Sequence, residues 1–194
     1  MSTSKLDGSG LAALLPRLEL SPQAAAAIGA RQTPSAAVNE LRQADLLPEA
    51  ARLCAHALPA RERVWWAARC ARATADASLS DADLKACELA EEWVRHRTHD
   101  RRRAAMDAAL RAGCTTAEAW TAVAAFWSGD SMAPAGQPKV PPAPHLAGTA
   151  VVGAIILASV RTFPQRQEAR LRRFLRSALD IAAGGAGYIE PEVA

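Results

Sequence analysis

Residues 146–160 read LAGTAVVGAIILASV, fifteen residues without a charged side chain between His145 and Arg161. A helix that crosses a bilayer needs roughly 20 consecutive apolar residues. This run is shorter, and two glycines, a threonine and a serine dilute it. A helix that is apolar on every side is buried in a protein core or in a membrane. We therefore expect no membrane span, and instead a buried central helix around which the other helices pack.

The composition of the whole chain favours an all-α protein. The 194 residues include 47 Ala but only 9 Val, 5 Ile and 9 Thr, so the best helix former outnumbers the β-branched residues about two to one. The length corresponds to one domain, and the 50% share of hydrophobic residues is enough to build its core. The net charge of +3 permits contact with an acidic partner but does not indicate a nucleic-acid-binding protein.

Side chains suited to capping mark the beginnings of three helices in the middle of the chain. Ser80 and Asp83 have the spacing of a capping box, Thr98 is placed to cap the next helix, and Thr115 with Glu118 forms a second box. Only tight turns separate these helices, so we expect them to be antiparallel neighbours. Upstream of them, prolines divide the chain into shorter helices.

The expected architecture is a single compact bundle of about seven or eight helices with one long proline-rich loop. The helical domain spans residues 33–183, and an N-terminal segment with short helices spans residues 1–32. Residues 184–194 form a C-terminal tail that we expect to be frayed, although Tyr188 and Ile189 could dock. Residues 128–144 hold five of the twelve prolines. A loop of that length inside a compact domain is usually functional or a linker, and its prolines favour an extended backbone.

The cysteines and histidines form no metal-binding pattern. None of the four cysteines belongs to a C-x-x-C pair, and the only close pairs of ligands are Cys54 with His56 and His96 with His99. Zinc sites normally show two tight ligand pairs or a helical H-E-x-x-H motif. Unpaired thiols and a polar N-terminus without a signal segment indicate a reducing compartment. We expect a cytoplasmic protein with no metal and no cofactor.

One short motif suggests a nucleophile. Residues 129–132 read GDSM, which superficially matches the G-D-S block of one class of esterases. That block follows a strand, and its serine needs a later aspartate and histidine. Here it follows a helix, and the only later candidates are Asp180 and His145. We expect Ser131 to be a turn residue, and a serine hydrolase that uses Ser131 is the weakest of the alternatives.

Arginines are concentrated in two places. Residues 101–103 are three arginines in the first turn of a helix, where the helix dipole disfavours cations. Arg166, Arg170 and Arg173 follow i, i+4, i+7 spacing and form a ridge on the last helix. Such a ridge is either an ordinary polar face or a docking surface for an acidic protein or a nucleic acid. No aromatic side chains interleave with it as base stacking requires, so nucleic acid is the less favoured partner.

Two adjacent tryptophans indicate a surface for contact with another protein. Trp65 and Trp66 lie about 100° apart on a helix, so both cannot point into the same core. One of them is therefore available to line a groove, and tryptophan is a common anchor of protein interfaces.

Several strings of this sequence occur together in a known family. In order along the chain they are RVWWAARC (63–70), AEEWV (90–94), RRRAA (101–105), WSGDSMAP (127–134) and VPPAPHL (140–146). With them the chain resembles an uncharacterised family of small all-helical proteins, found mostly in proteobacteria and often encoded near type VI secretion genes. The resemblance covers residues 50–183 and brings no enzymatic activity with it. It implies a role beside effector delivery, such as an adaptor or co-chaperone.

The function predicted from the sequence is therefore that of a non-enzymatic protein-interaction module. The expected partner is another protein, either a secreted effector or its chaperone, and the sequence gives no indication of the oligomeric state. Nucleic-acid binding through the arginine ridge is the alternative. The expected partner-binding residues are Trp65, Trp66, Ser128, Gly129, Asp130, Ser131, Met132, Pro134, Pro141, Pro142, Arg166, Arg170 and Arg173.

Overall fold

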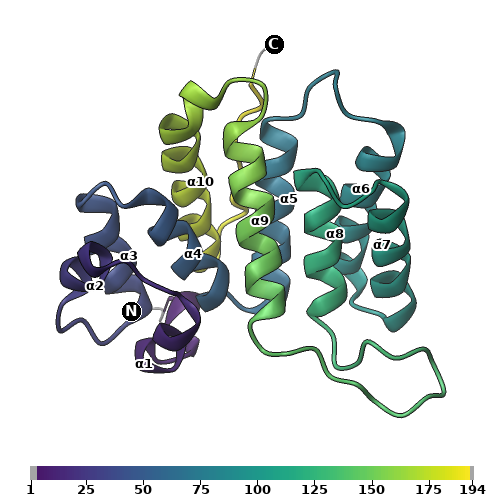
Figure 1. Ribbon diagram of the computed structural model, residues 1–194, viewed down its shortest axis with the longest axis horizontal. Coiled ribbons are helices and arrows are strands. Elements are labelled where there is room, and N and C mark those ends of the chain that lie inside the picture. Colours follow the sequence, from purple (N-terminus) through teal and green to yellow (C-terminus); the bar gives the residue numbers. More distant parts are fainter. Residues whose placement is uncertain (1–3, 193–194) are drawn as a thin grey trace.

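The computed structural model describes residues 4–192, and within that range the chain contains helices and no strand (Figure 1). This confirms the all-α class. Ten α-helices and three short 3₁₀ helices are present there, so the expected count of seven or eight was too low. The difference arises near the N-terminus, where prolines separate several short helices from one another. The elements are η1 (Lys5–Gly8), α1 (Leu11–Leu14), η2 (Leu15–Arg17), α2 (Pro22–Ile28), α3 (Pro34–Gln43), α4 (Leu47–Ala57), α5 (Ala60–Ala73), α6 (Asp81–His96), α7 (His99–Arg111), α8 (Ala117–Trp127), α9 (Leu146–Val160), η3 (Pro164–Arg166) and α10 (Gln167–Ala182).

Helix α9 lies at the centre of the bundle, as the uncharged run predicts. It contacts α8 and α5 on one side and α4 and α10 on the other (Figure 1). Much of its inner face is alanine, with Ala150, Ala154 and Ala158 all buried. Short side chains let neighbouring helices approach closely. On one side α5 and α8 pack against α9, with α6 and α7 beyond them, and α1 to α4 lie across the bundle (Figure 1).

Two of the three expected helix beginnings are confirmed. Ser80 forms a complete capping box, and the hydroxyl of Thr98 accepts a backbone hydrogen bond from the first turn of α7. The third was wrong by one residue, because Thr116 rather than Thr115 caps α8. Glu118 does not close a box there: its side chain is buried inside the bundle and has a different partner.

Residues 184–192 of the C-terminal tail pack along the body of the protein, which corrects the expectation of a frayed tail. Ile189 is buried there, as its expected docking requires, whereas Tyr188 is exposed. After α10 the chain reverses at two glycines with positive φ, Gly184 and Gly187, and returns beside α10 and α5 (Figure 1). The Ser177 hydroxyl donates a hydrogen bond to the Gly187 carbonyl at 2.7 Å, and the Glu192 amide donates one to the Ala73 carbonyl at 2.8 Å.

One cluster of buried apolar side chains extends from Leu6 to Ile189. The expected N-terminal segment (1–32) and tail (184–194) therefore contribute to the same core as residues 33–183. Residues 1–3 and 193–194, at the ends of these two segments, lie outside the described residues. Within the described range no single helix is both long and apolar enough to cross a membrane; α9 taken together with residues 164–182, at a bend of 113°, meets that test by length and composition.

Candidate functional site

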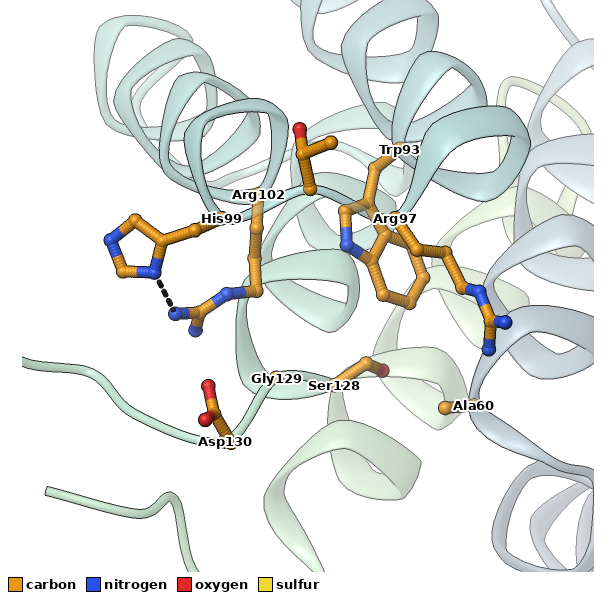
Figure 2. A pocket seen from close by; sticks show the side chains of 9 residues that line it. Ala60, Trp93, Arg97, His99, Arg102, Ser128, Gly129 and Asp130 are labelled. Atoms are coloured by element: carbon orange, nitrogen blue, oxygen red, sulfur yellow. Dashed lines mark hydrogen bonds between the residues drawn. The ribbon is translucent and has the colours of Figure 1, made fainter. Parts of the chain in front are cut away.

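A cleft of about 320 Å³ opens where the proline-rich loop leaves α8 (Figure 2). We call it the loop cleft. The beginning of α5, the turn between α6 and α7, and the first loop residues surround it. Three of the predicted partner-binding residues line it, namely Ser128, Gly129 and Asp130. The other lining residues are Ala60, Trp93, Arg97, Thr98, His99 and Arg102.

Arg102 fixes the beginning of the loop. Its side chain is 2% exposed and donates hydrogen bonds to the Phe126 carbonyl at 2.8 Å and to the Ser131 carbonyl at 2.5 Å. Its guanidinium group also lies 5.1 Å from the centre of the Phe126 ring. A Cβ atom on Gly129 would collide with the Arg102 side chain, so any other residue there would force the arginine to move. Burial lowers the pKa of Arg102 from its usual value.

The sequence prediction did not assign Arg102 to the site. One feature of the sequence could have indicated it: Arg102 lies in the first turn of a helix, where a cation is unfavourable unless another contact holds it. That contact is the pair of carbonyl groups at the end of α8 and in the loop. Because these carbonyls come from distant parts of the chain, helix periodicity does not reveal them.

His99 extends this arrangement into the loop cleft. Its Nδ1 atom lies 3.1 Å from Arg102 Nη2, as Figure 2 shows. An arginine only donates, so Nδ1 accepts and the proton of a neutral ring lies on Nε2. Nε2 is buried and has no hydrogen-bond partner among residues 4–192. The contact with Arg102 therefore orients the imidazole at the cleft wall and leaves the Nε2–H group without a hydrogen-bond acceptor.

Hydrogen bonds within the loop close its base. The Ser131 hydroxyl accepts hydrogen bonds from the backbone amides of Ala133 at 3.1 Å and Val140 at 3.0 Å, and the Met132 amide donates to the Val140 carbonyl at 2.7 Å. Ser131 is 6% exposed, and within the described range no histidine or carboxylate contacts its hydroxyl. In this structure Ser131 stabilises a turn.

The outer part of the loop is presented to solvent. Pro134 and Pro141 are exposed, Pro142 is half-buried, and Val140 is 50% exposed. Lys139 in the same segment pairs with Asp130 at 2.5 Å, and this contact holds the pKa of Asp130 below its usual value. The loop thus displays apolar and proline side chains on a base that hydrogen bonds hold in place.

The two adjacent tryptophans have different environments. Trp66 is fully buried and its indole N–H donates to the Phe174 carbonyl at 2.8 Å, so Trp66 belongs to the core and its assignment as a partner-binding residue was wrong. Trp65 is half-buried, and its indole N–H donates to the Ala186 carbonyl at 2.9 Å. The Arg69 guanidinium lies 5.5 Å from the centre of the Trp65 ring.

Trp65 lines a second cleft, of about 410 Å³, which we call the tryptophan cleft. It lies between α5, the end of α6 and the C-terminal tail, and its other lining residues are Lys5, Arg61, Glu62, Val94, Arg95, Ile181, Gly184, Gly185 and Ala186. Lys5 and Glu62 pair at 2.9 Å across one wall.

The two clefts lie on either side of one contact between α5 and α6, and we call this part of the surface the interaction corner. Consecutive residues at the start of α5, Ala60 and Arg61, line the loop cleft and the tryptophan cleft respectively. The Arg61 side chain donates to the Val94 carbonyl at 3.1 Å and so joins the two helices between the clefts. Arg95 and Arg97 are exposed beside this contact. The structure therefore places Trp65 and the loop base on neighbouring parts of one basic surface.

The predicted arginine ridge is largely occupied by the tail. Arg166, Arg170 and Arg173 lie on one face of α10 and its preceding turn, and all three pair with Glu192, at 3.4, 2.7 and 3.1 Å. Arg170 is 3% exposed and also donates to the Ser159 carbonyl. Arg170 is therefore inaccessible to a partner in this structure, which corrects its assignment as a partner-binding residue.

The Glu192 contacts lead to a prediction about the tail. Hydrogen bonding to Arg170, together with the charges of the nearby arginines, holds the pKa of Glu192 below its usual value. A carboxyl group whose pKa is lowered by folding stabilises the folded state above its unfolded pKa of about 4.3, and that stabilisation is lost as the pH falls through the lower folded pKa. We expect tail docking to persist at neutral pH and to weaken only below about pH 4.

The substitution Glu192→Gln should release the tail at neutral pH, with a cost of about 1 kcal/mol in unfolding free energy. Hydrogen exchange at residues 186–192 and the fluorescence of Trp65 report the release. Glu190→Gln is the matched control, because the Glu190 side chain is exposed. Equal exchange in both variants would contradict the role given to Glu192.

Comparison with known protein families identifies the family to which this chain belongs. The sequence model of one protein family, described as a family of unknown function (DUF6931), matches residues 37–182. The match covers 146 of the 194 residues, from α3 to the end of α10. The chain belongs to this family. This agrees with the resemblance to an uncharacterised helical family noted from the sequence. Searches of curated proteins and of solved structures found no match to the chain.

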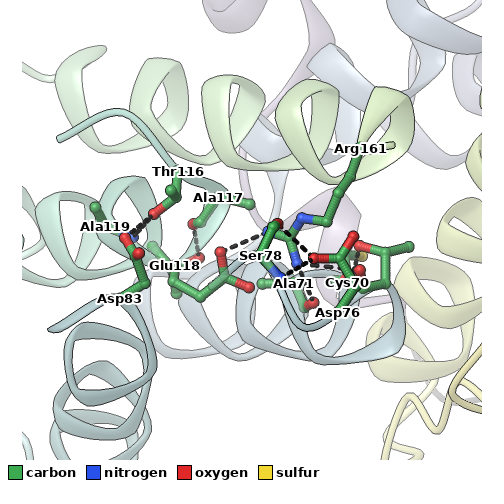
Figure 3. Close-up of polar contacts among 12 residues, drawn as sticks. Cys70, Ala71, Asp76, Ser78, Asp83, Thr116, Ala117, Glu118, Ala119 and Arg161 are labelled. Atoms are coloured by element: carbon green, nitrogen blue, oxygen red, sulfur yellow. Dashed lines mark hydrogen bonds and ion pairs between the residues drawn. The ribbon is translucent and has the colours of Figure 1, made fainter. Parts of the chain in front are cut away.

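Within the DUF6931 region, a buried ion pair connects the ends of three helices (Figure 3). Arg161, after α9, lies 2.5 Å from Glu118 at the start of α8, and it donates to the Thr74 carbonyl after α5 at 3.1 Å. Glu118 is 1% exposed. Hydrogen bonds from Ser78 and Thr162 lower the pKa of Asp76 beside this pair to about 2. These contacts join the ends of α5, α8 and α9.

Three of the four cysteines in the DUF6931 region are poorly reactive in this structure. Cys54, Cys70 and Cys87 are buried, and desolvation raises the pKa of each thiol, to about 12 for Cys54 and Cys87. A thiol that stays protonated is a poor nucleophile and a poor metal ligand. Among residues 4–192 no group of three or more histidine, cysteine, aspartate or glutamate side chains is arranged to hold a metal ion.

Proposed function

We propose that the chain is a non-enzymatic protein-interaction module that binds an acidic segment of a partner protein at the interaction corner. The observation that carries this proposal is the contact between Arg61 and Val94, which has the cleft of Trp65 on one side and the cleft at the base of the displayed loop on the other. A groove with an aromatic anchor and a polar rim is a common form of protein-binding surface.

The charge at this corner favours an acidic partner. Arg95 and Arg97 are exposed at the end of α6, and Arg97 has no carboxylate partner among residues 4–192. Arg95 lies 4.0 Å from the nearest carboxylate, that of Glu91, which also pairs with Arg72 at 3.1 Å. Arginine is enriched among the residues that contribute most to binding, because its planar group stacks and forms paired hydrogen bonds.

The resemblance noted from the sequence gives the proposal its biological setting. We place the protein in the cytoplasm of a proteobacterium, as an adaptor or co-chaperone in effector delivery by type VI secretion. Its partner is then a secreted effector or the chaperone of one. The nucleic-acid alternative loses support because Glu192 pairs with all three arginines of the ridge. The hydrolase alternative loses support because the Ser131 hydroxyl accepts two backbone hydrogen bonds in a buried turn.

Replacement of Trp65 tests the proposal directly. We expect Trp65→Ala to weaken binding to an effector encoded beside this protein by at least about 30-fold, which corresponds to about 2 kcal/mol for an interface anchor. Arg97→Glu should also weaken binding and should reduce its dependence on salt. Affinities are measured by calorimetry with the purified pair.

Leu110→Ala is the matched control, because Leu110 is a large apolar residue of α7 with 59% exposure that lines neither cleft. Circular dichroism establishes that each variant is folded. Affinities of Trp65→Ala and Arg97→Glu equal to that of the control would exclude the interaction corner as the binding surface.

A further inference from the structure

A third cleft, of about 490 Å³, lies away from the interaction corner. It is bounded by residues 16–19, by the second half of α4, and by the first two turns of α9, where the proline-rich loop re-enters the bundle (Figure 1). None of its lining residues belongs to either cleft of the interaction corner. The cleft therefore needs an explanation of its own.

A buried histidine without a hydrogen-bond partner lines this cleft. His56 of α4 is 6% exposed, and its ring forms no hydrogen bond with residues 4–192. The ring lies against Gly148 in the first turn of α9, where a Cβ atom would collide with Nδ1. The ring nitrogens remain accessible from the cleft, so a group that fills the cleft can form hydrogen bonds with the ring.

Positive charge surrounds His56. Burial and the neighbouring charges of Arg63, Arg17 and Arg52, with a further contribution from His145, lower the pKa of His56 to about 4. The ring is therefore neutral at neutral pH, with one nitrogen able to donate and the other able to accept. A cation at this position is disfavoured because the site already concentrates positive charge, and for the same reason an anion is favoured.

The two arginines of the cleft have donors to spare. Arg52 uses Nη1 for the Leu18 carbonyl at 2.8 Å and the Glu19 carbonyl at 3.4 Å, which fixes its position. Arg17 is exposed and forms no hydrogen bond with the described residues. Among residues 4–192, Glu19 supplies the only carboxylate that lines the cleft, so the two guanidinium groups outweigh it.

The geometry points to a binding site for a phosphate group, free or carried by a small molecule, formed by Arg17, Arg52, His56 and His145. Arginine donors match the oxygens of a phosphate group, and the neutral His56 ring can add a donor. His145 is the N-cap of α9, yet its side chain caps no amide. The volume of the cleft exceeds that of a lone phosphate ion and falls in the range usual for small-molecule sites.

The test follows the ring signals of His56 and His145 by NMR while inorganic phosphate or ribose 5-phosphate is added to the full chain at constant ionic strength. We expect saturable shifts of both rings. Arg17→Ala should raise the dissociation constant for phosphate at least about tenfold, and Glu19→Gln should lower it because a like charge is removed. Arg176→Ala, on the exposed face of α10, is the matched control.

The two probes separate the possible ligands. Tighter binding of ribose 5-phosphate identifies a phosphorylated small molecule, and equal binding identifies the free ion; either outcome supports a phosphate site. The absence of saturable shifts with both probes would overturn it, and so would an affinity that Arg17→Ala leaves unchanged. Because Arg17 is exposed, its replacement is compatible with folding, and His56→Gln serves as a second variant that keeps a donor and an acceptor.

Discussion

Replacement of Arg161 by alanine is expected to lower the free energy of unfolding by about 3–5 kcal/mol. The guanidinium group is buried at 9% side-chain exposure between Glu118, itself 1% exposed, and the carbonyl of Thr74. Its removal leaves a carboxylate in the interior without a partner, and an unpaired buried charge is far more costly than a missing surface contact. Urea denaturation followed by circular dichroism measures the change.

The double replacement Glu118→Leu with Arg161→Leu separates the loss of the ion pair from the cost of leaving one buried charge without a partner. Because both charges are removed together, we expect it to recover at least half of the stability lost in the single variant. Arg176→Ala, an exposed arginine, should change stability by less than about 0.5 kcal/mol. If Arg161→Ala behaves like Arg176→Ala, the ion pair does not hold the helix ends together.

Replacement of Arg102 by alanine should have the second largest effect, a loss of about 3 kcal/mol. Two buried carbonyl groups, those of Phe126 and Ser131, then lose a charged donor. The loop base should loosen as well, so limited proteolysis should cut the exposed segment near Gln137 faster than in the wild-type protein. Denaturation and the rate of cleavage measure the two consequences separately.

Two further variants sharpen that experiment. Gly129→Ala should also lower stability and speed cleavage, although Arg102 itself is retained, because the added Cβ would displace the Arg102 side chain. Arg111→Ala, an exposed arginine on the same helix, should leave both stability and cleavage unchanged. A wild-type cleavage rate in both Arg102→Ala and Gly129→Ala would show that the loop is held by other contacts.

Features of the fold that depend on nearby residues were predictable from the sequence. The uncharged run gave the position of α9, and short-range capping patterns gave the beginnings of α6 and α7. The capping pattern misplaced α8 by one residue because two threonines stand side by side and the carboxylate of Glu118 has a tertiary partner. A capping pattern reflects only interactions between residues close together in the sequence, and an ion pair with a distant residue can outweigh them.

The candidate site depended more on distant contacts and was less predictable. The sequence established that Trp65 and Trp66 face different ways, but the neighbours of α5 decide which of them is buried. The spacing of Arg166, Arg170 and Arg173 correctly put them on one face, yet their partner Glu192 follows two glycine reversals that no periodicity reveals. Arg102 and the cleft at His56 likewise join segments far apart in the chain.

The alanine-lined contacts around α9 determine which mutations the family can accumulate. A core built from large side chains fails mainly when one of them is truncated and leaves a cavity. Here Ala150, Ala154 and Ala158 are already nearly as small as a side chain can be, so there is little to truncate. Added methyl groups would force the helices apart, at a typical cost of about 1–3 kcal/mol each. At these three positions selection should therefore act mainly against increases in side-chain volume.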